Sequence, residues 1–229
     1  MYNRYANKGG SSHDMLVRAL QECGVNYYDI TADLIEMREK EDFDIFSKTG
    51  HHWTLTAAAN EMDKILTETQ KMSQYSSMPT VKFNGVNDVL FDTDKDVLNL
   101  QNVLIPKLAD RYNSPETTID STDDSAFLFG TSFGWEIAGV LYKNANERAF
   151  NQLIYQEYFT TKVLYSAAGE SRSLYTINDT PDDIGVMNSI YNSNIVIMEQ
   201  NGSLGIMDTH KKFVGYVIEN LESGTISIT

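Results

Sequence analysis

The sequence predicts a layered α/β protein with a mainly parallel sheet. Apolar segments with strand character alternate with amphipathic helical segments, and this alternation favours a parallel sheet covered by helices. At residues 126–141 an apolar strand, a glycine turn and a helix follow one another directly. With 229 residues, 41% of them hydrophobic, the chain can bury one core, and we expect a single domain over residues 1–229.

The N-terminal part is predicted to form a helix, a strand and a second short helix. The first helix has a serine cap, Ser11 or Ser12, has apolar residues at helical spacing and ends at Gly24. Cys23 falls on the apolar face of this helix, so we expect it to be buried. The β-branched and aromatic residues at 25–30 favour a strand.

A further helix and a β-hairpin are predicted next. Thr54 or Thr56 caps the helix, which has one apolar face. Asn84-Gly85 separates two short apolar runs, and this dipeptide is typical of a tight hairpin turn. We therefore expect a small hairpin insertion at about residues 79–92.

The second half of the chain is predicted to supply the centre of the sheet. Residues 114–125 are polar and acidic and predict a loop before the apolar strand AFLF at 126–129. Residues 194–199 (NIVIME) predict another buried strand, and residues 208–221 predict a helix.

Charge and composition exclude several classes of function. The 18 basic and 32 acidic residues give a net charge of −14, which repels nucleic acid, so we expect no nucleic-acid partner. One cysteine allows no internal disulfide or multi-thiolate site, and the adjacent His51 and His52 would point to opposite sides of an extended segment. We therefore expect no metal and no other cofactor. We also expect no transmembrane segment, because no apolar run approaches the ~20 residues that span a bilayer. We expect no signal peptide in this sequence, because the N-terminal MYNRYANKGG lacks an apolar stretch.

Ser132 is the candidate nucleophile. It lies in Gly130-x-Ser132-x-Gly134, between an apolar strand and a helix. Glycines allow a sharp turn that lifts a serine hydroxyl out of the sheet edge, and the helix N-terminus offers amides to an oxyanion. Gly130, Thr131 and Gly134 would form this turn and its oxyanion site. The alternative is a serine that only caps the helix.

His52 is the candidate general base. It precedes a predicted helix, whose positive dipole end favours the neutral imidazole that a base requires. The alternative is a histidine that is buried or serves as a cap.

Two motifs of this chain occur together in a known family. They are KTGHHWT, which contains His52, and LFGTSF, which contains Ser132, 80 positions after His52. In this order they resemble the DHHW family and the alginate O-acetyltransferase proteins of the AlgX/AlgJ type. The resemblance implies an SGNH-hydrolase-like, three-layer α/β/α fold of flavodoxin-like type. It also implies that Ser132 accepts the acyl group and that His52 is the base.

By the same resemblance, the activity would be O-acetyl transfer to, or hydrolysis from, a cell-surface polysaccharide or a smaller acylated glycan outside the cytoplasm. The acyl donor is left open. Trp53 and Trp135 flank the two motifs and would line the substrate groove. Glu199 and Asn201 follow a predicted strand, where α/β folds place binding residues, and would contribute polar contacts.

Two departures from the family pattern change these expectations. Gly50 stands where the family has the aspartate that orients the histidine, so the enzyme would be weak or inactive unless Asp42 or Asp44 supplies the carboxylate. A non-catalytic glycan-binding or scaffolding relative is therefore the alternative. The chain also begins close to its first helix, from which we expect an N-terminally truncated fold.

A different enzyme remains open at this stage. An α/β-hydrolase would use Ser132, then Asp182 or Asp183, and then His210 in chain order. Asp208 and His210 could also serve Ser132 in the usual SGNH order. Against the α/β-hydrolase, Asp208 to Lys211 is typical of a capped helix start. The SGNH order with Asp208 and His210 is the alternative if His52 points away from Ser132.

Overall fold

The computed structural model describes residues 11–75, 77–92, 111–144, 146–157, 161–166, 173–176, 184–200 and 208–223. The helices in these ranges are α1 (Ser12–Glu22), α2 (Thr31–Lys40), α3 (Leu55–Gln70), α5 (Gly134–Leu141), α6 (Ile184–Tyr191) and α7 (Asp208–Ser223), with a short 3-10 turn, η2 (Ser73–Tyr75). The strands are β1 (Thr80–Asp92), β2 (Arg111–Asp120), β3 (Thr122–Gly130), β4 (Tyr142–Asn144), β5 (Glu147–Arg148), β6 (Phe150–Glu157), β7 (Thr161–Ser166), β8 (Ser173–Thr176) and β9 (Ile195–Met198). None of these helices combines the length and apolar character needed to cross a membrane.

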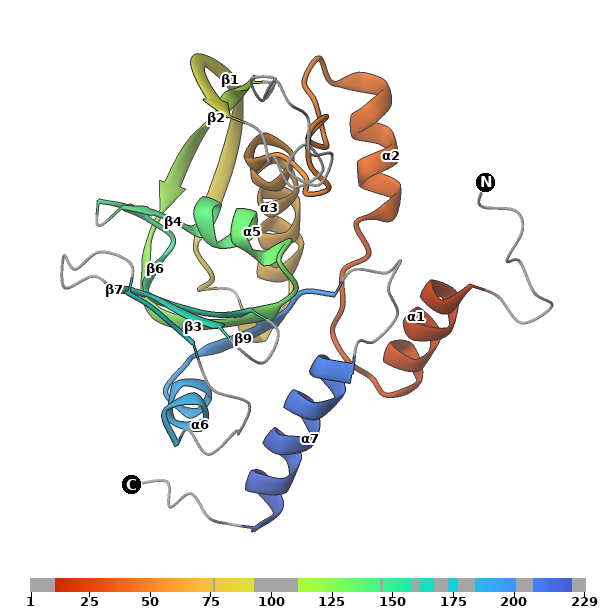
Figure 1. Cartoon of the computed structure of the whole chain (residues 1–229), viewed down its shortest axis with the longest axis vertical. Coiled ribbons are helices and arrows are strands. Elements are labelled where there is room, and N and C mark those ends of the chain that lie inside the picture. The colour runs from red at the N-terminus through yellow and green to blue at the C-terminus, as the bar shows by residue number, and fades with distance from the viewer. Residues whose placement is uncertain are drawn as a thin grey trace, which may run out of the picture.

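The centre of the molecule is a five-stranded sheet with the order β8-β7-β6-β3-β9. Strands β6, β3 and β9 run parallel, and β7 and β8 extend the sheet with antiparallel pairings. Figure 1 shows α3 and α5 on one face of this sheet and α6 and α7 on the other. The predicted three-layer α/β/α fold is therefore confirmed.

The side chains of β3 explain the three layers, because successive residues of a strand point to opposite faces. Ala126 and Leu128 pack in the cluster formed with α3 and α5, and Phe127 packs in the cluster formed with α7. In the second cluster the ring of Phe129 stacks on Phe213 of α7 at 3.9 Å between centroids. A strand that is apolar on both faces is typical of the centre of a covered parallel sheet.

An antiparallel pair lies beside this sheet, but it differs from the predicted hairpin. β1 continues through Asn84 and Gly85 as one strand and pairs with β2, which occupies much of the segment predicted as a loop. Gly85 has a φ of 120° at a register shift after Phe83. The predicted tight turn is therefore wrong at this position: the glycine accommodates a β-bulge, which also needs an unusual backbone conformation.

Three other expectations are corrected by the structure. Residues 25–30 form a loop, because β-branched and aromatic residues need neighbouring strands to form a sheet. β9 is an edge strand, so Val196 and Met198 are exposed instead of buried. Cys23 is exposed at the C-terminal cap of α1 and does not join the core.

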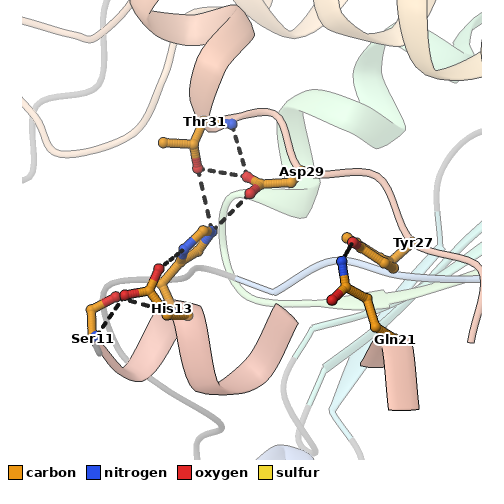
Figure 2. A network of polar contacts seen from close by, with 7 residues as sticks. Ser11, His13, Gln21, Tyr27, Asp29 and Thr31 are labelled. Carbon is orange, nitrogen blue, oxygen red and sulfur yellow. Dashed lines mark hydrogen bonds and ion pairs between the residues drawn. The ribbon is translucent and has the colours of Figure 1, made fainter. Parts of the chain in front are cut away.

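Polar contacts tie α1 to the start of α2 (Figure 2). The imidazole Nε2 of His13 lies 3.1 Å from Asp29 Oδ2, while the hydroxyl and the backbone N–H of Thr31 donate to Asp29 Oδ1 at 2.6 and 3.0 Å. Burial alone would raise the pKa of Asp29, but the Thr31 bonds and His13 hold it below its usual value. Gln21 donates to the hydroxyl of Tyr27 at 2.6 Å on the same side of α1.

Candidate active site

Ser132 lies in the turn between β3 and α5, at the carboxyl end of the parallel strands. β3 ends at Gly130 and α5 begins at Gly134, so the turn has only three residues between them. Its backbone is closed by the N–H of Gly134, which donates to Thr131 O at 2.9 Å, and by the N–H of Trp135, which donates to Ser132 O at 3.3 Å. Ser132 itself is half-buried, so its hydroxyl lies at the edge of the molecule's interior.

Side chains from both neighbouring strands hold Thr131, the residue before Ser132. From the β9 side, Glu199 Oε2 accepts the backbone N–H of Thr131 at 2.7 Å and its hydroxyl at 2.8 Å. From β6, the hydroxyl of Tyr155 donates to Thr131 O. Burial raises the pKa of Glu199, although the two bonds from Thr131 act in the opposite direction. The amide of Thr131 is thus already hydrogen-bonded to the Glu199 carboxylate.

Two glycines make these close contacts possible. A Cβ on Gly130 would lie 2.7 Å from Glu199 Oε2, and a Cβ on Gly134 would lie 2.7 Å from Cε2 of the fully buried Tyr155. Both distances are below van der Waals contact. The glycines of the motif are therefore required by the side chains that surround the turn.

His52 is carried by a loop directly before α3. The loop is closed by a bridge between Phe46 and Trp53, in which the N–H of Ser47 donates to His52 O at 3.0 Å. The side chain of Thr54 accepts the N–H of Ala57 and caps α3, as the sequence predicts. His52 is half-buried, like Ser132.

The structure brings His52 and Ser132 together across these 80 residues: His52 Nε2 lies 2.7 Å from Ser132 Oγ. The His52 ring packs on Phe133 at 5.1 Å in an edge-to-face arrangement and on His51 at 3.9 Å between centroids. The two imidazoles therefore lie on the same side of the loop, and not on opposite sides as expected for an extended segment. The indole N–H of Trp53 donates to Phe133 O at 3.0 Å and so joins the histidine loop to the serine turn. A serine hydroxyl within hydrogen-bond distance of an imidazole is the geometry required for nucleophile activation.

Among solved structures, the fold is similar to that of the O-acetyltransferase domain of Pseudomonas putida AlgJ. The TM-score is 0.52, the sequence identity is 14%, and the alignment covers 93% of this chain and 72% of that chain. At this identity the similarity concerns the fold alone. No protein-family model and no curated protein matches the sequence.

The carboxylates near the motif in sequence have other contacts. Asp44 Oδ2 pairs with Lys48 Nζ at 2.9 Å. Asp42 and Asp44 both line a groove of about 430 Å³, together with side chains of β1, β2 and α3 that include Arg111 and Tyr112. Burial raises the pKa of Tyr112 to about 12, and the nearby Glu136 of α5 contributes to this rise. Position 50 itself has no side chain that could orient His52.

The remaining predicted residues are distributed differently. Trp53 is only 5% exposed, so little of it is available to line an open groove. Trp135 donates its indole N–H to Glu157 Oε2 at 2.9 Å. Three of the predicted residues lie outside the described residues: Asn201 and the alternative acids Asp182 and Asp183. The backbone of Asp208 and His210 forms the first turn of α7, but their side chains are also outside the described part.

Sequence reasoning missed how Thr131 is held. The sequence predicts Thr131 as part of the turn and its oxyanion site and Glu199 as a groove residue, but it does not indicate that Glu199 and Tyr155 bind Thr131. The parallel register that sets Gly130 opposite Glu157 of β6 decides which side chains reach the turn. The sequence carries one signal of this close packing around the turn, because glycines on both sides of a serine indicate that bulky neighbours approach closely.

Proposed function

We propose that this protein is a serine acyl-esterase or O-acetyltransferase that acts on a cell-surface polysaccharide, with Ser132 as nucleophile and His52 as general base. The observation that carries the proposal is the 2.7 Å distance between His52 Nε2 and Ser132 Oγ. The similarity of the fold to an O-acetyltransferase domain supports acetyl as the transferred group. A site of action outside the cytoplasm is proposed from the family resemblance of the two motifs. No cofactor takes part in the chemistry proposed here.

In the first half of the reaction, His52 Nε2 takes the proton of Ser132 Oγ as this oxygen attacks the acyl carbonyl carbon. A tetrahedral intermediate forms and its oxygen becomes negative; an amide at the N-terminal end of α5, with that of Ser132 as the candidate, would stabilise this charge. The intermediate then collapses, His52 returns the proton to the leaving oxygen, and the acyl group remains on Ser132.

In the second half, a sugar hydroxyl or a water molecule attacks the acyl-serine carbonyl and gives its proton to His52. The C–O bond to Ser132 breaks, and Ser132 Oγ recovers the proton from the imidazole. Attack by a sugar makes the enzyme a transferase, and attack by water makes it an esterase. Trp135 and Glu199 flank the turn, and we assign Trp135 to the wall of the acceptor groove.

Gly50 favours a second candidate function, a non-catalytic relative that binds glycan. In a serine triad the acid fixes the tautomer of the histidine and stabilises its cation, and loss of this acid costs ~10⁴ in kcat in a serine protease. The residue at the position of this acid in the resembling family is Gly50 here. The two candidates therefore differ in whether the Ser132–His52 contact supports turnover.

An assay of the hydrolysis of an activated acetyl ester distinguishes these candidates. It compares the native chain with the variants Ser132→Ala, His52→Ala, Gly50→Asp and Gly50→Asn. We expect Ser132→Ala and His52→Ala to abolish the activity. Gly50→Asp should raise the rate about tenfold or more by restoring the orienting carboxylate. Gly50→Asn is the matched control, because it adds a side chain of the same size without the charge.

The results separate the two functions. A rate that is unchanged in Ser132→Ala would rule out Ser132 as the nucleophile. If the native chain and Gly50→Asp both lack a Ser132-dependent rate, the glycan-binding function is favoured.

A further inference from the structure

We propose that Glu199 is a positioning residue for the nucleophile: by binding Thr131 through one carboxylate oxygen, it fixes the direction in which Ser132 presents its hydroxyl. This inference rests on the proposed function and adds to it a residue that touches neither Ser132 nor His52 in the contacts described above. It also differs from the groove role expected for Glu199 from the sequence.

The contacts on Thr131 carry the proposal. Thr131 is 1% exposed, and its N–H and hydroxyl both donate to Glu199 Oε2, at 2.7 and 2.8 Å. Its carbonyl oxygen accepts from Tyr155 and from the N–H of Gly134. The peptide groups on both sides of the Thr131 Cα are therefore fixed, and the position of the next residue, Ser132, follows from them.

The same carboxylate organises the rest of the turn through the Thr131 hydroxyl. While this hydroxyl donates to Glu199, its oxygen accepts the N–H of Phe133 at 3.3 Å. Phe133 in turn contacts the His52 ring and accepts the indole N–H of Trp53. Through one threonine, Glu199 thus sets the position of the serine and of the ring against which the histidine packs.

The location of Glu199 suits this role because its own backbone is fixed to the nucleophile strand. Its N–H donates to Phe129 O at 2.7 Å, so its side chain starts at the end of β3. Gly130 leaves room for its Cβ and carboxylate. Burying a carboxylate is unfavourable unless it accepts hydrogen bonds, and a double acceptor beside the nucleophile is consistent with a functional placement.

The test compares Glu199→Leu and Glu199→Gln in the full chain, with ester hydrolysis as the readout and Ser132→Ala as the blank. The leucine is close in size and accepts no hydrogen bond, whereas the glutamine oxygen can accept both Thr131 donors. We expect Glu199→Leu to lower kcat at least about tenfold with KM nearly unchanged, because misplaced groups lose rate at the chemical step. Glu199→Gln should keep kcat within about threefold, since the acceptor is restored.

Glu61→Leu is the matched control, because Glu61 is a fully buried glutamate in the middle of α3. It should leave kcat within about twofold whatever it does to the melting temperature, because the described ion pair of Glu61 is with Lys64 of the same helix and not with the serine turn or the histidine loop. If Glu199→Leu does not accumulate as folded protein, Thr131→Val replaces it, since valine removes the hydroxyl donor and keeps the amide. We expect a smaller loss of kcat in that variant.

Two results would overturn the positioning role alone while the proposed function stands. One is a Ser132-dependent kcat that survives in Glu199→Leu, or in Thr131→Val where that variant is used. The other is an equal loss in Glu199→Leu and Glu199→Gln, which would show that the acceptor is not what matters. A native chain with no Ser132-dependent rate would instead end the proposed function and this inference with it.

Discussion

The turn that carries Ser132 lies between β6 and β9, whereas the loop that carries His52 lies outside the sheet, before α3. On the serine side, Glu199 directly after β9 and the buried Tyr155 of β6 bind the backbone of Thr131. On the histidine side, an isolated β-bridge, the indole of Trp53 and ring contacts hold the imidazole.

The two halves also differ in the residues of the sequence motifs themselves. The serine half has glycines where neighbours approach closely and polar partners for Thr131, so its geometry is strongly determined. In the histidine half, Gly50 provides no orienting carboxylate. Under the proposed function, a substitution in either half should therefore lower the rate, and the following changes test the comparison.

Gly134→Ala should have the largest effect, because it attacks the serine half where packing is tightest. The added Cβ would lie 2.7 Å from Tyr155 Cε2 and 3.0 Å from the Tyr155 hydroxyl oxygen. Overpacking of this kind should cost about 3 kcal/mol of unfolding free energy and abolish activity, as measured by urea denaturation and ester hydrolysis. Gly215→Ala in α7, with nothing within 4 Å of the added Cβ, is the control and should stabilise the protein slightly. Equal stabilities for the two variants would contradict the account of the turn.

Glu61→Gln, in the helix that follows the histidine loop, should have the next largest effect, which is on the pH dependence of stability. Burial raises the pKa of Glu61 to about 7, although Lys64 Nζ lies 3.2 Å from its Oε1. Since the folded pKa is higher than the unfolded value of 4.5, folding binds the proton, and stability is full below pH 4.5 and falls as pH rises through 7.

We expect the native chain to lose about 2 kcal/mol of stability across this pH range on account of Glu61. Glu61→Gln should flatten the dependence, which urea denaturation at several pH values would measure. The burial of Glu199 raises its pKa as well, so some dependence should remain. An unaltered pH profile in Glu61→Gln would rule out Glu61 as its source.

Trp53→Phe should have the smallest effect on stability and is the most direct probe of the link between the halves. Phenylalanine keeps the buried ring but leaves Phe133 O without its 3.0 Å donor. We expect a cost of about 1 kcal/mol in urea denaturation, because one buried acceptor loses its partner. If the indole aligns the two halves, the loss of kcat, expressed as activation free energy, should exceed the loss of unfolding free energy. A rate that stays at the native value would show that the rings alone hold His52.

Much of the fold could be predicted from local signals. The caps Ser11 and Thr54 and the strand, turn and helix around Ser132 occur as expected, because capping and periodicity act within a few residues. The errors concern pairing: the loop at 25–30 has strand character, and β9 was expected to be buried and forms an edge. Both depend on which strands are neighbours, which local sequence does not encode.

The site divides in the same way. Ser132 and His52 were candidates on local grounds, but their pairing was suggested only by a family resemblance and not by spacing. The contacts of Glu199 and Tyr155 with Thr131 could not be predicted, because they depend on strand order and register. An acidic residue after a strand indicates a binding position, and it does not reveal that the carboxylate turns back toward the protein.

The long separation of the interacting residues has a consequence for how the protein matures. His52 and Ser132 are 80 positions apart, and Glu199 is 68 positions from Thr131. Contacts between such distant segments form late, after the entropy of closing large loops has been lost. A partly folded chain could thus contain α3 or β3 before the contact between His52 and Ser132 has formed. Under the proposed function, a newly made chain would have no esterase activity until β9 has joined the sheet, and the appearance of activity would mark the completion of folding.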